Sequence, residues 1–288
     1  MITGKTATTG VIGNPIAHTM SPAIHNAAFA YLGLDYVYLP FRVLPEELEA
    51  AIGGAKALNF VGLNVTIPHK KAVIPLLDEL SPEAEILGTV NTIHYRDGKA
   101  IGHNTDGIGF MRALQEEAGC EPKKKVVTIL GTGGATKAVA VQLALAGAVQ
   151  LNIVGRDVEK AEIICMAIKR ANPLCETNTC SIHDVKELEN NLAKSHILVH
   201  ATSVGMYPHQ TQAPLVNRNM LHRGLLVCDL VYNPVVTGIL KEAEAIGCQT
   251  LSGLGMLLYQ GASAFSLWTG RDAPIEIMKK VLQANLKG

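Results

Sequence analysis

The chain has 288 residues, of which 48% are hydrophobic and 17% are charged, and its formal net charge is zero. This composition excludes a disordered chain and supplies enough apolar surface for substantial cores. The balanced charge, without a dense run of lysine and arginine, argues against nucleic acid as a partner. At about 100–200 residues per domain, the length predicts two domains.

Cysteine usage and hydropathy indicate the compartment. The six cysteines are scattered and form no C-x-x-C pair, as expected of reduced thiols. The chain does not open with a charged segment followed by an apolar one, and no apolar run reaches the roughly 20 residues of a membrane span. The histidines show no regular metal-ligand spacing. The sequence therefore predicts a cytoplasmic protein with no membrane contact and no metal.

In the first half, strand-like and helix-like segments alternate, which is typical of α/β proteins. Ser21 is the predicted N-cap of the first helix, with Pro22 at its first helical position. Strands are predicted over residues 8–12, 36–42, 62–67 and 89–95. Helices are predicted over residues 23–32, 45–52, 70–77 and 82–86.

The second half opens with the continuous apolar run Val126–Leu130, which has the length of a buried parallel strand. Further strands are predicted over residues 150–154, 197–201 and 225–229. Helices are predicted over residues 135–146, 158–171, 236–246, 255–267 and 274–286. The boundary is expected near Asp106-Gly107, with the helices past Gly253 packing back on the first domain. The predicted domains are therefore 1–106 plus 253–288, and 107–252.

A glycine-rich turn joins the first strand of the second domain to its helix. It reads Gly131-x-Gly133-Gly134-Ala135-Thr136, a departure from G-x-G-x-x-G. Glycines permit the tight turn and let backbone N–H groups approach a pyrophosphate at a helix N-terminus. Such turns also serve as plain connections, but a second strand follows at the expected distance. The pattern predicts a dinucleotide site.

The end of that second strand bears on the choice of cofactor. An acidic residue there typically binds the ribose 2′-OH of NAD, whereas arginine accommodates the 2′-phosphate of NADP. Arg156 and Lys160 favour NADP, and Asp157 opposes it unless it only caps the following helix. The sequence favours NADP and keeps NAD as the alternative.

Three segments of the first half place polar residues after strand-like runs: Asn64–Lys70, Val90–Thr92 and Gly102–Gly107. Because ligands collect at the carboxyl ends of strands in α/β sheets, we expect these loops to share a pocket. Their amide, hydroxyl, ammonium and carboxylate groups suit a small polyhydroxylated acid. Lys70 paired with Asp106 could exchange a proton with an alcohol oxygen. Taken singly, Lys70 is as easily explained as a surface lysine, and Asp106 as a helix cap.

These motifs, with others along the chain, resemble the shikimate and quinate/shikimate dehydrogenase family. The resemblance extends over nearly the whole chain. The additional segments that carry it are 13–22, 200–206, 229–234 and 253–260. It implies a substrate-binding catalytic domain formed by 1–106 plus 253–288, and a Rossmann-like NAD(P)-binding domain formed by 107–252.

The resemblance also implies a role for individual residues. Lys70 and Asp106 match the catalytic pair, with Lys70 as the acid/base. The matching substrate-binding positions are Thr19, Ser21, Tyr38, Asn64, Thr66, Asn91, Thr105 and Gln260. The matching cofactor-binding positions are Gly131, Gly133, Gly134, Ala135, Arg156, Asp157, Lys160, Thr202, Val204, Tyr232, Gly253 and Met256. The implied reaction is the reversible NADPH-dependent reduction of 3-dehydroshikimate to shikimate, by a monomer or homodimer.

Two departures from the family pattern leave alternatives open. Thr19 replaces the usual serine and narrows the pocket by a methyl group, so shikimate and quinate both stay candidate substrates. Gly155-Arg156-Asp157 departs from the usual NADP pattern. The alternatives are an NAD-preferring quinate/shikimate dehydrogenase, a dehydrogenase of another cyclic substrate such as an aminated shikimate analogue, and a non-catalytic nucleotide sensor.

Overall fold

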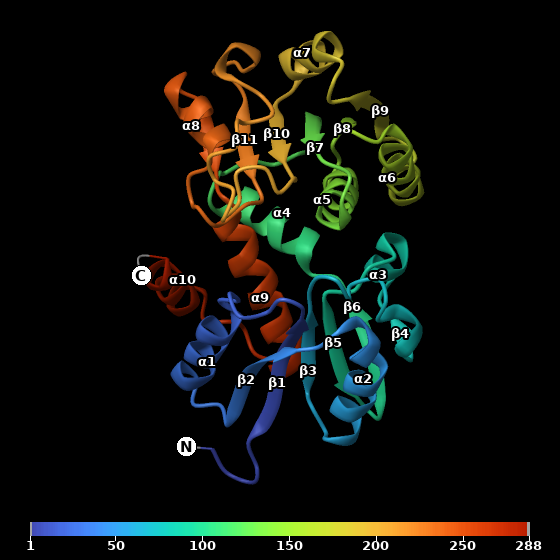
Figure 1. Ribbon diagram of the computed structural model, residues 1–288, viewed down its shortest axis with the longest axis vertical. Helices are drawn as coiled ribbons and strands as arrows, with labels where there is room; N and C mark the ends of the chain where they lie inside the picture. Colours follow the sequence, from blue (N-terminus) through green and yellow to red (C-terminus); the bar gives the residue numbers. More distant parts are fainter. Residues whose placement is uncertain (1, 287–288) are drawn as a thin grey trace. The chain divides into compact units, whose positions relative to one another are not determined.

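The computed structural model describes residues 2–286, and the chain divides into two compact units. Unit 1 consists of Met1–Thr105 with Leu258–Gly288, and unit 2 of Asp106–Leu257. Each unit contains one six-stranded sheet with helices packed against it (Figure 1). The predicted α/β fold class is thereby confirmed. Within residues 2–286, none of the helices combines the length and the hydrophobicity that crossing a membrane requires.

The sheet of unit 1 is mixed, with strand order β2-β1-β3-β5-β6-β4. Its strands are β1 (Ala7–Gly13), β2 (Tyr36–Arg42), β3 (Gly62–Val65), β4 (Glu79–Leu80), β5 (Thr92–Arg96) and β6 (Lys99–His103). Strand β5 runs antiparallel to both β3 and β6, and Thr92 pairs with Asn64 on one side and His103 on the other. The beginning of β5 therefore lies at the same edge as the ends of β3 and β6.

Helices cover both faces of this sheet. On one face, α2 (Leu48–Ala57) and α3 (Pro82–Leu87) pack on a core that includes Ile12, Leu63 and Ile93. On the other face, the helices of a second core are α1 (Ser21–Tyr31), α9 (Gly253–Thr269) and α10 (Ile275–Asn285). There the rings of Phe29 and Phe265 lie 5.1 Å apart, and Trp268 Nε1 donates to the Ile93 carbonyl at 3.0 Å. The C-terminal helices thus pack back on the first unit, as predicted.

Two local predictions for unit 1 are wrong. The N-cap of α1 is Met20, and Ser21 is already helical, because its hydroxyl bonds to Tyr38 instead of capping the helix. Residues 70–77 form turns and a single 3₁₀ turn, Ile74–Leu76, where a helix is predicted. Pro75 explains this result, since its ring lacks the N–H and clashes with the preceding turn of an α-helix.

Unit 2 has an all-parallel sheet with order β12-β11-β10-β7-β8-β9. Its strands are β7 (Val126–Leu130), β8 (Gln150–Gly155), β9 (Glu176–Ser181), β10 (Ile197–His200), β11 (Leu226–Asp229) and β12 (Gln249–Leu251). Numbered within the unit, this order is that of a Rossmann domain, whose ligand crevice lies where the strand order reverses. The reversal point is the pair β7–β10.

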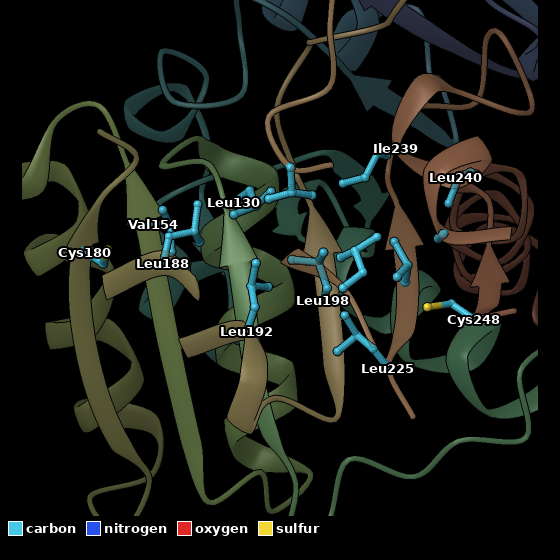
Figure 2. Packing of buried hydrophobic residues seen from close by; sticks show 14 residues of the cluster. Leu130, Val154, Cys180, Leu188, Leu192, Leu198, Leu225, Ile239, Leu240 and Cys248 are labelled. Carbon is cyan, nitrogen blue, oxygen red and sulfur yellow. The ribbon is translucent and has the colours of Figure 1, made fainter. Parts of the chain in front are cut away.

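Both faces of the unit 2 sheet are buried. Its helices are α4 (Asp106–Glu116), α5 (Gly134–Leu145), α6 (Val158–Ala171), α7 (Val185–Lys194) and α8 (Gly238–Ala245). Figure 2 shows Leu130 and Leu198 of the sheet with Leu188 of α7 and Leu240 of α8 in one core. This core supports the residues that follow β7 and β10.

No predicted element corresponds to the strands β4, β6, β9 and β12 or to the helices α4 and α7. Strand β9 is an edge strand, and its sequence Glu-Thr-Asn-Thr-Cys-Ser lacks the apolar run of the central strands. Helix α7 is strongly amphipathic but polar overall, with Leu188 and Leu192 as its buried apolar residues. Both elements depend on packing against the sheet more than on their own hydrophobicity.

We predict opposite stability effects for two glycine-to-alanine substitutions in unit 1. A Cβ at Gly62 would lie 1.9 Å from Trp268 Nε1, so Gly62→Ala should destabilise the protein by about 1–3 kcal/mol. Gly53 is exposed within α2 with open space around it, so Gly53→Ala should stabilise by roughly 0.5–1 kcal/mol. Denaturation followed by fluorescence of Trp268, the single tryptophan, measures both. Equal stabilities of the two variants would contradict the close approach at Gly62.

Candidate functional site

Polar side chains gather at the edge of the unit 1 sheet where β3 and β6 end and β5 begins. Asn64 lies in β3, and Thr105 follows β6 by two residues. Asn91 was predicted within a strand, but it precedes β5. Because β5 is antiparallel to its neighbours, Asn91 nevertheless reaches the same edge. The structure therefore brings together three of the predicted substrate-binding residues.

Hydrogen bonds fix the orientation of these three side chains. Asn64 Nδ2 donates to Thr92 Oγ1 at 3.0 Å and to the Asn91 carbonyl at 3.2 Å. Asn91 Oδ1 accepts from the Thr105 N–H at 2.8 Å, and Asn91 Nδ2 donates to Thr105 Oγ1 at 3.0 Å. Thr92, which was not a predicted site residue, links Asn64 to Asn91 because its hydroxyl also contacts Asn91 Oδ1 at 3.0 Å. The network holds hydroxyl and amide groups in fixed positions.

Tyr38 contributes to this edge from inside the core. Its side chain is fully buried, and its hydroxyl donates to Asn64 Oδ1 at 2.7 Å. Burial raises the pKa of the phenol well above its usual value, while a hydrogen bond with Ser21 acts in the opposite direction. The Tyr38 ring stacks on His25 with centroids 4.4 Å apart and planes 1° apart. Burial lowers the pKa of His25 to about 3, so the stacked imidazole is neutral.

Lys70 sits in a loop whose backbone is anchored at several points. The His69 N–H donates to the Thr66 carbonyl at 2.9 Å, and the Val90 N–H donates to the Lys70 carbonyl at 2.8 Å. The buried His69 ring bonds to the Val43 carbonyl at 2.8 Å. These bonds fix the backbone at Lys70 without a helix, and the lysine is half-buried.

Thr19, Gln260 and Asp106, three further residues predicted to bind substrate or to act in catalysis, lie on separate elements. Thr19 Oγ1 accepts from the Ser21 N–H at 3.3 Å, which folds the segment before α1 over its first turn. Gln260 lies on α9 and is half-buried. Asp106 is 8% exposed and begins α4, directly after Thr105 in the chain.

In unit 2, the glycine turn lies at the switch point of the sheet. Gly131 has φ +122°, and a Cβ there would lie 2.7 Å from the Ala201 carbonyl oxygen, so only glycine fits. Gly133 faces open space, and α5 begins at exposed Gly134 without a side-chain cap. In the first turn of α5, after Ala135, Thr136 Oγ1 is buried without a hydrogen-bond partner. A helix N-terminus that has no side-chain cap, and that is preceded by glycines without side chains, fits a pyrophosphate.

Asp157 is the N-cap of α6. Its Oδ1 accepts from the Lys160 N–H at 3.2 Å, and its Oδ2 pairs with Lys160 Nζ at 2.8 Å. These contacts with Lys160 hold the pKa of the Asp157 carboxyl below its usual value. Arg156 beside it is exposed. The Asp157 carboxylate thus caps α6, and its charge is offset by Lys160.

Thr202 and Val204 follow β10, and Tyr232 follows β11. Thr202 Oγ1 accepts from the Val204 N–H at 3.2 Å. Burial raises the pKa of Tyr232. A Cβ at Gly253 would lie 2.4 Å from the Leu230 carbonyl oxygen, so the start of α9, where half-buried Met256 lies, approaches this loop closely.

Sequence reasoning assigned no role to His200, Asp229 and Thr237, which form a buried network beside Thr202. His200 Nδ1 lies 2.9 Å from Asp229 Oδ1, and His200 Nε2 lies 2.6 Å from Thr202 Oγ1. Thr237 Oγ1 donates to Asp229 Oδ2. A signal was present, because His200 and Asp229 are polar residues that each end an apolar strand. Within residues 2–286, no group of three or more histidine, cysteine, aspartate or glutamate side chains could hold a metal ion.

We predict that Asp157→Ala lowers the stability of unit 2 by about 0.5–2 kcal/mol through loss of the helix cap. Asp157→Asn should stay close to wild type, since asparagine caps equally well and an exposed ion pair contributes little. Asp184→Ala, which removes the corresponding cap of α7, is the matched control and should cost a similar amount. Thermal unfolding followed by circular dichroism compares the three. An Asp157→Asn variant as unstable as Asp157→Ala would rule out the cap.

Three family models match successive parts of the chain. They are described as "Shikimate dehydrogenase substrate binding domain" for residues 11–93, "Shikimate / quinate 5-dehydrogenase" for residues 113–232 and "Shikimate 5'-dehydrogenase C-terminal domain" for residues 253–283. The shikimate dehydrogenase (NADP(+)) of Methanopyrus kandleri is 48% identical over 286 residues, which cover 99% of this chain and 98% of that protein.

Solved structures show the same similarity. A shikimate dehydrogenase crystallised in complex with NADP+ is 45% identical with a TM-score of 0.92, covering 99% of this chain and 98% of the other. The shikimate 5-dehydrogenase of Listeria monocytogenes, in complex with shikimate and NAD, is 44% identical with a TM-score of 0.93, and 98% of each chain is covered.

Proposed function

Because this chain belongs to the shikimate dehydrogenase family, we propose that it catalyses the reversible NADPH-dependent reduction of 3-dehydroshikimate to shikimate. It is an NAD(P)-dependent oxidoreductase that acts on a CH–OH group, in the pathway to chorismate and the aromatic amino acids. The observation that carries the proposal is the hydrogen-bonded edge of Asn64, Asn91 and Thr105, in a chain that also contains an open glycine turn. The Lys70 carbonyl is joined to this edge through the N–H of Val90, the residue before Asn91.

The cofactor-binding domain is formed by residues 107–252. The turn formed by Gly131, Gly133, Gly134 and Ala135 takes the pyrophosphate at the N-terminus of α5. Arg156 offers positive charge for the 2′-phosphate, and the pairing of Asp157 with Lys160 offsets the carboxylate that would oppose it, which supports NADP over NAD. Thr202, Val204, Tyr232, Gly253 and Met256 surround the nicotinamide half. When bound, NADPH supplies the hydride.

The substrate-binding domain is formed by residues 1–106 plus 253–288. The hydroxyls of Thr19 and Ser21 hold the substrate carboxylate. The ring hydroxyls are held by the polar side chains of Asn64, Thr66, Asn91, Thr105 and Gln260. Tyr38 acts through Ser21 and Asn64, because its own side chain is fully buried and its hydroxyl bonds to both.

Lys70 is the acid/base of the reaction. Its ammonium donates a proton to the oxygen of the ketone as that oxygen gains negative charge, and Asp106 orients the lysine and hydrogen-bonds the substrate. The contribution of the protein is therefore positioning of the reactants plus stabilisation of charge at one oxygen.

We predict that Lys70→Ala lowers kcat by about 10²–10⁴-fold and changes KM much less, since the ammonium acts mainly in the transition state. Lys71→Ala is the matched control, because it removes the exposed neighbouring lysine and should leave kcat near the wild-type value. Initial rates from the absorbance of the reduced nicotinamide measure both variants. An unchanged kcat in Lys70→Ala would remove the lysine from the mechanism.

A second candidate is an NAD-preferring quinate/shikimate dehydrogenase. Thr19 leaves quinate open as a substrate, and the Gly155-Arg156-Asp157 segment leaves NAD open as the cofactor. The protein should be assayed with shikimate or quinate and with NADP+ or NAD+, in all four combinations. We expect the highest kcat/KM for shikimate with NADP+. Preference for NAD+ or comparable turnover of quinate would support the second candidate, and no turnover in any combination would support a nucleotide sensor.

The proposal also includes a cytoplasmic location and a monomeric or homodimeric state, as the sequence predicts. Light scattering during gel filtration measures the molecular mass directly. A mass near that of one or two chains agrees with the expectation, and a larger assembly contradicts it.

A further inference from the structure

A buried chain of hydrogen bonds begins at the carboxyl ends of β10 and β11. The two strands are parallel, and their last residues, His200 and Asp229, are register partners. Their side chains are 2% and 0% exposed. Burial of an imidazole and a carboxyl group is unfavourable unless both are hydrogen-bonded, so their arrangement must be closely defined.

Asp229 is the acceptor on which several donors of this network converge. Asp229 accepts from the Val231 N–H at 2.9 Å and from the Thr237 hydroxyl. As the acceptor, it places the hydrogen of the His200 ring on Nδ1. His200 Nε2 shares a hydrogen bond with Thr202 Oγ1 at 2.6 Å, and Thr202 Oγ1 accepts from the Val204 N–H.

This chain of bonds joins three segments of unit 2: the loop after β10, the loop after β11 and the start of α8. The loop after β10 also adjoins the glycine turn, because the Ala201 N–H donates to the Leu130 carbonyl at 2.8 Å. Gly205 of this loop, with φ +80°, lies against Thr237, whose Cβ would be 3.8 Å from an added Cβ. The loop is therefore held from both sides at the switch point of the sheet.

Rossmann geometry assigns each side of the glycine turn to one half of the dinucleotide. The adenosine half extends toward β8, where Arg156 lies, and the nicotinamide half extends over β10. We propose that His200 is a positioning residue for the nicotinamide half: held by Asp229, it fixes Thr202 and the loop of residues 201–206 against that half. The inference rests on the proposed function and deepens it.

The variant that tests the role of His200 is His200→Asn. Asparagine retains a donor near the position of Nδ1 for Asp229, but its side chain is too short to reach Thr202. Loss of one such hydrogen bond should raise the Kd of NADPH roughly three- to tenfold. The Kd of adenosine 2′,5′-bisphosphate, which lacks the nicotinamide half, should stay unchanged. Isothermal titration calorimetry measures both ligands.

Thr202→Val provides a second, independent variant, since it removes the same hydrogen bond from a partly exposed position. It should give the same selective loss of NADPH affinity. In the double variant the two effects should be less than additive, because both substitutions remove the bond between His200 and Thr202, while Thr202→Val also removes the bond from the Val204 N–H.

Ser195→Ala is the matched control. Ser195 precedes the other end of β10 and is buried, and its hydroxyl bonds to Thr128 Oγ1 at 2.7 Å and to the Asn191 carbonyl at 2.8 Å. This substitution should lower the thermal stability of the protein without changing the Kd of either ligand. Comparison with this control distinguishes a general loss of stability from a loss of positioning of the loop of residues 201–206.

An unchanged Kd of NADPH in both His200→Asn and Thr202→Val would overturn the inference. Equal weakening of NADPH and adenosine 2′,5′-bisphosphate would overturn it as well, because the network would then only support the fold. The wild-type protein is measured first: failure to bind NADPH would overturn the proposed function together with this inference. A wild-type protein that binds and turns over, with variants that match it, would overturn the inference alone.

Discussion

Polar side chains buried at the ends of apolar strands must find hydrogen-bond partners, and the candidate residues in each unit depend on this constraint. In unit 1 the constraint joins Asn64, Asn91 and Thr105 into one network. In unit 2 it joins His200 to Asp229 and Thr202. In each case the apolar strands fix the backbone, and the hydrogen bonds fix the orientation of the functional groups.

The direction of β5 shows how topology serves this arrangement. In an all-parallel sheet, Asn91 would lie at the opposite edge from Asn64, because it precedes its strand. The antiparallel pairing of β5 with β3 and β6 brings its first residues to the edge where its neighbours end. The proposed substrate-binding groups, which are distant in sequence, thus come from strand ends and from a strand beginning.

The glycine turn and the α6 cap show two different arrangements of the N–H groups at a helix N-terminus. At Gly131 the absence of a side chain lets the turn approach Ala201, and the uncapped N-terminus of α5 leaves its N–H groups for an anion. At Asp157 the helix end is already capped, and Lys160 offsets the carboxylate. The two neighbouring helices therefore differ in whether a side chain caps their first turn.

The sequence by itself determined the fold class, the Rossmann half and the family, because apolar runs such as Val126–Leu130 and glycine turns are local signals. It did not determine β9, the 3₁₀ turn at Ile74–Leu76 or the N-cap at Met20, since edge pairing, proline sterics and side-chain competition decide these. The sequence also did not determine the hydrogen-bond partners of His200 and Tyr38. Only the tertiary structure decided them, because hydrogen bonds between residues far apart in the chain depend on strand register, which no local pattern encodes.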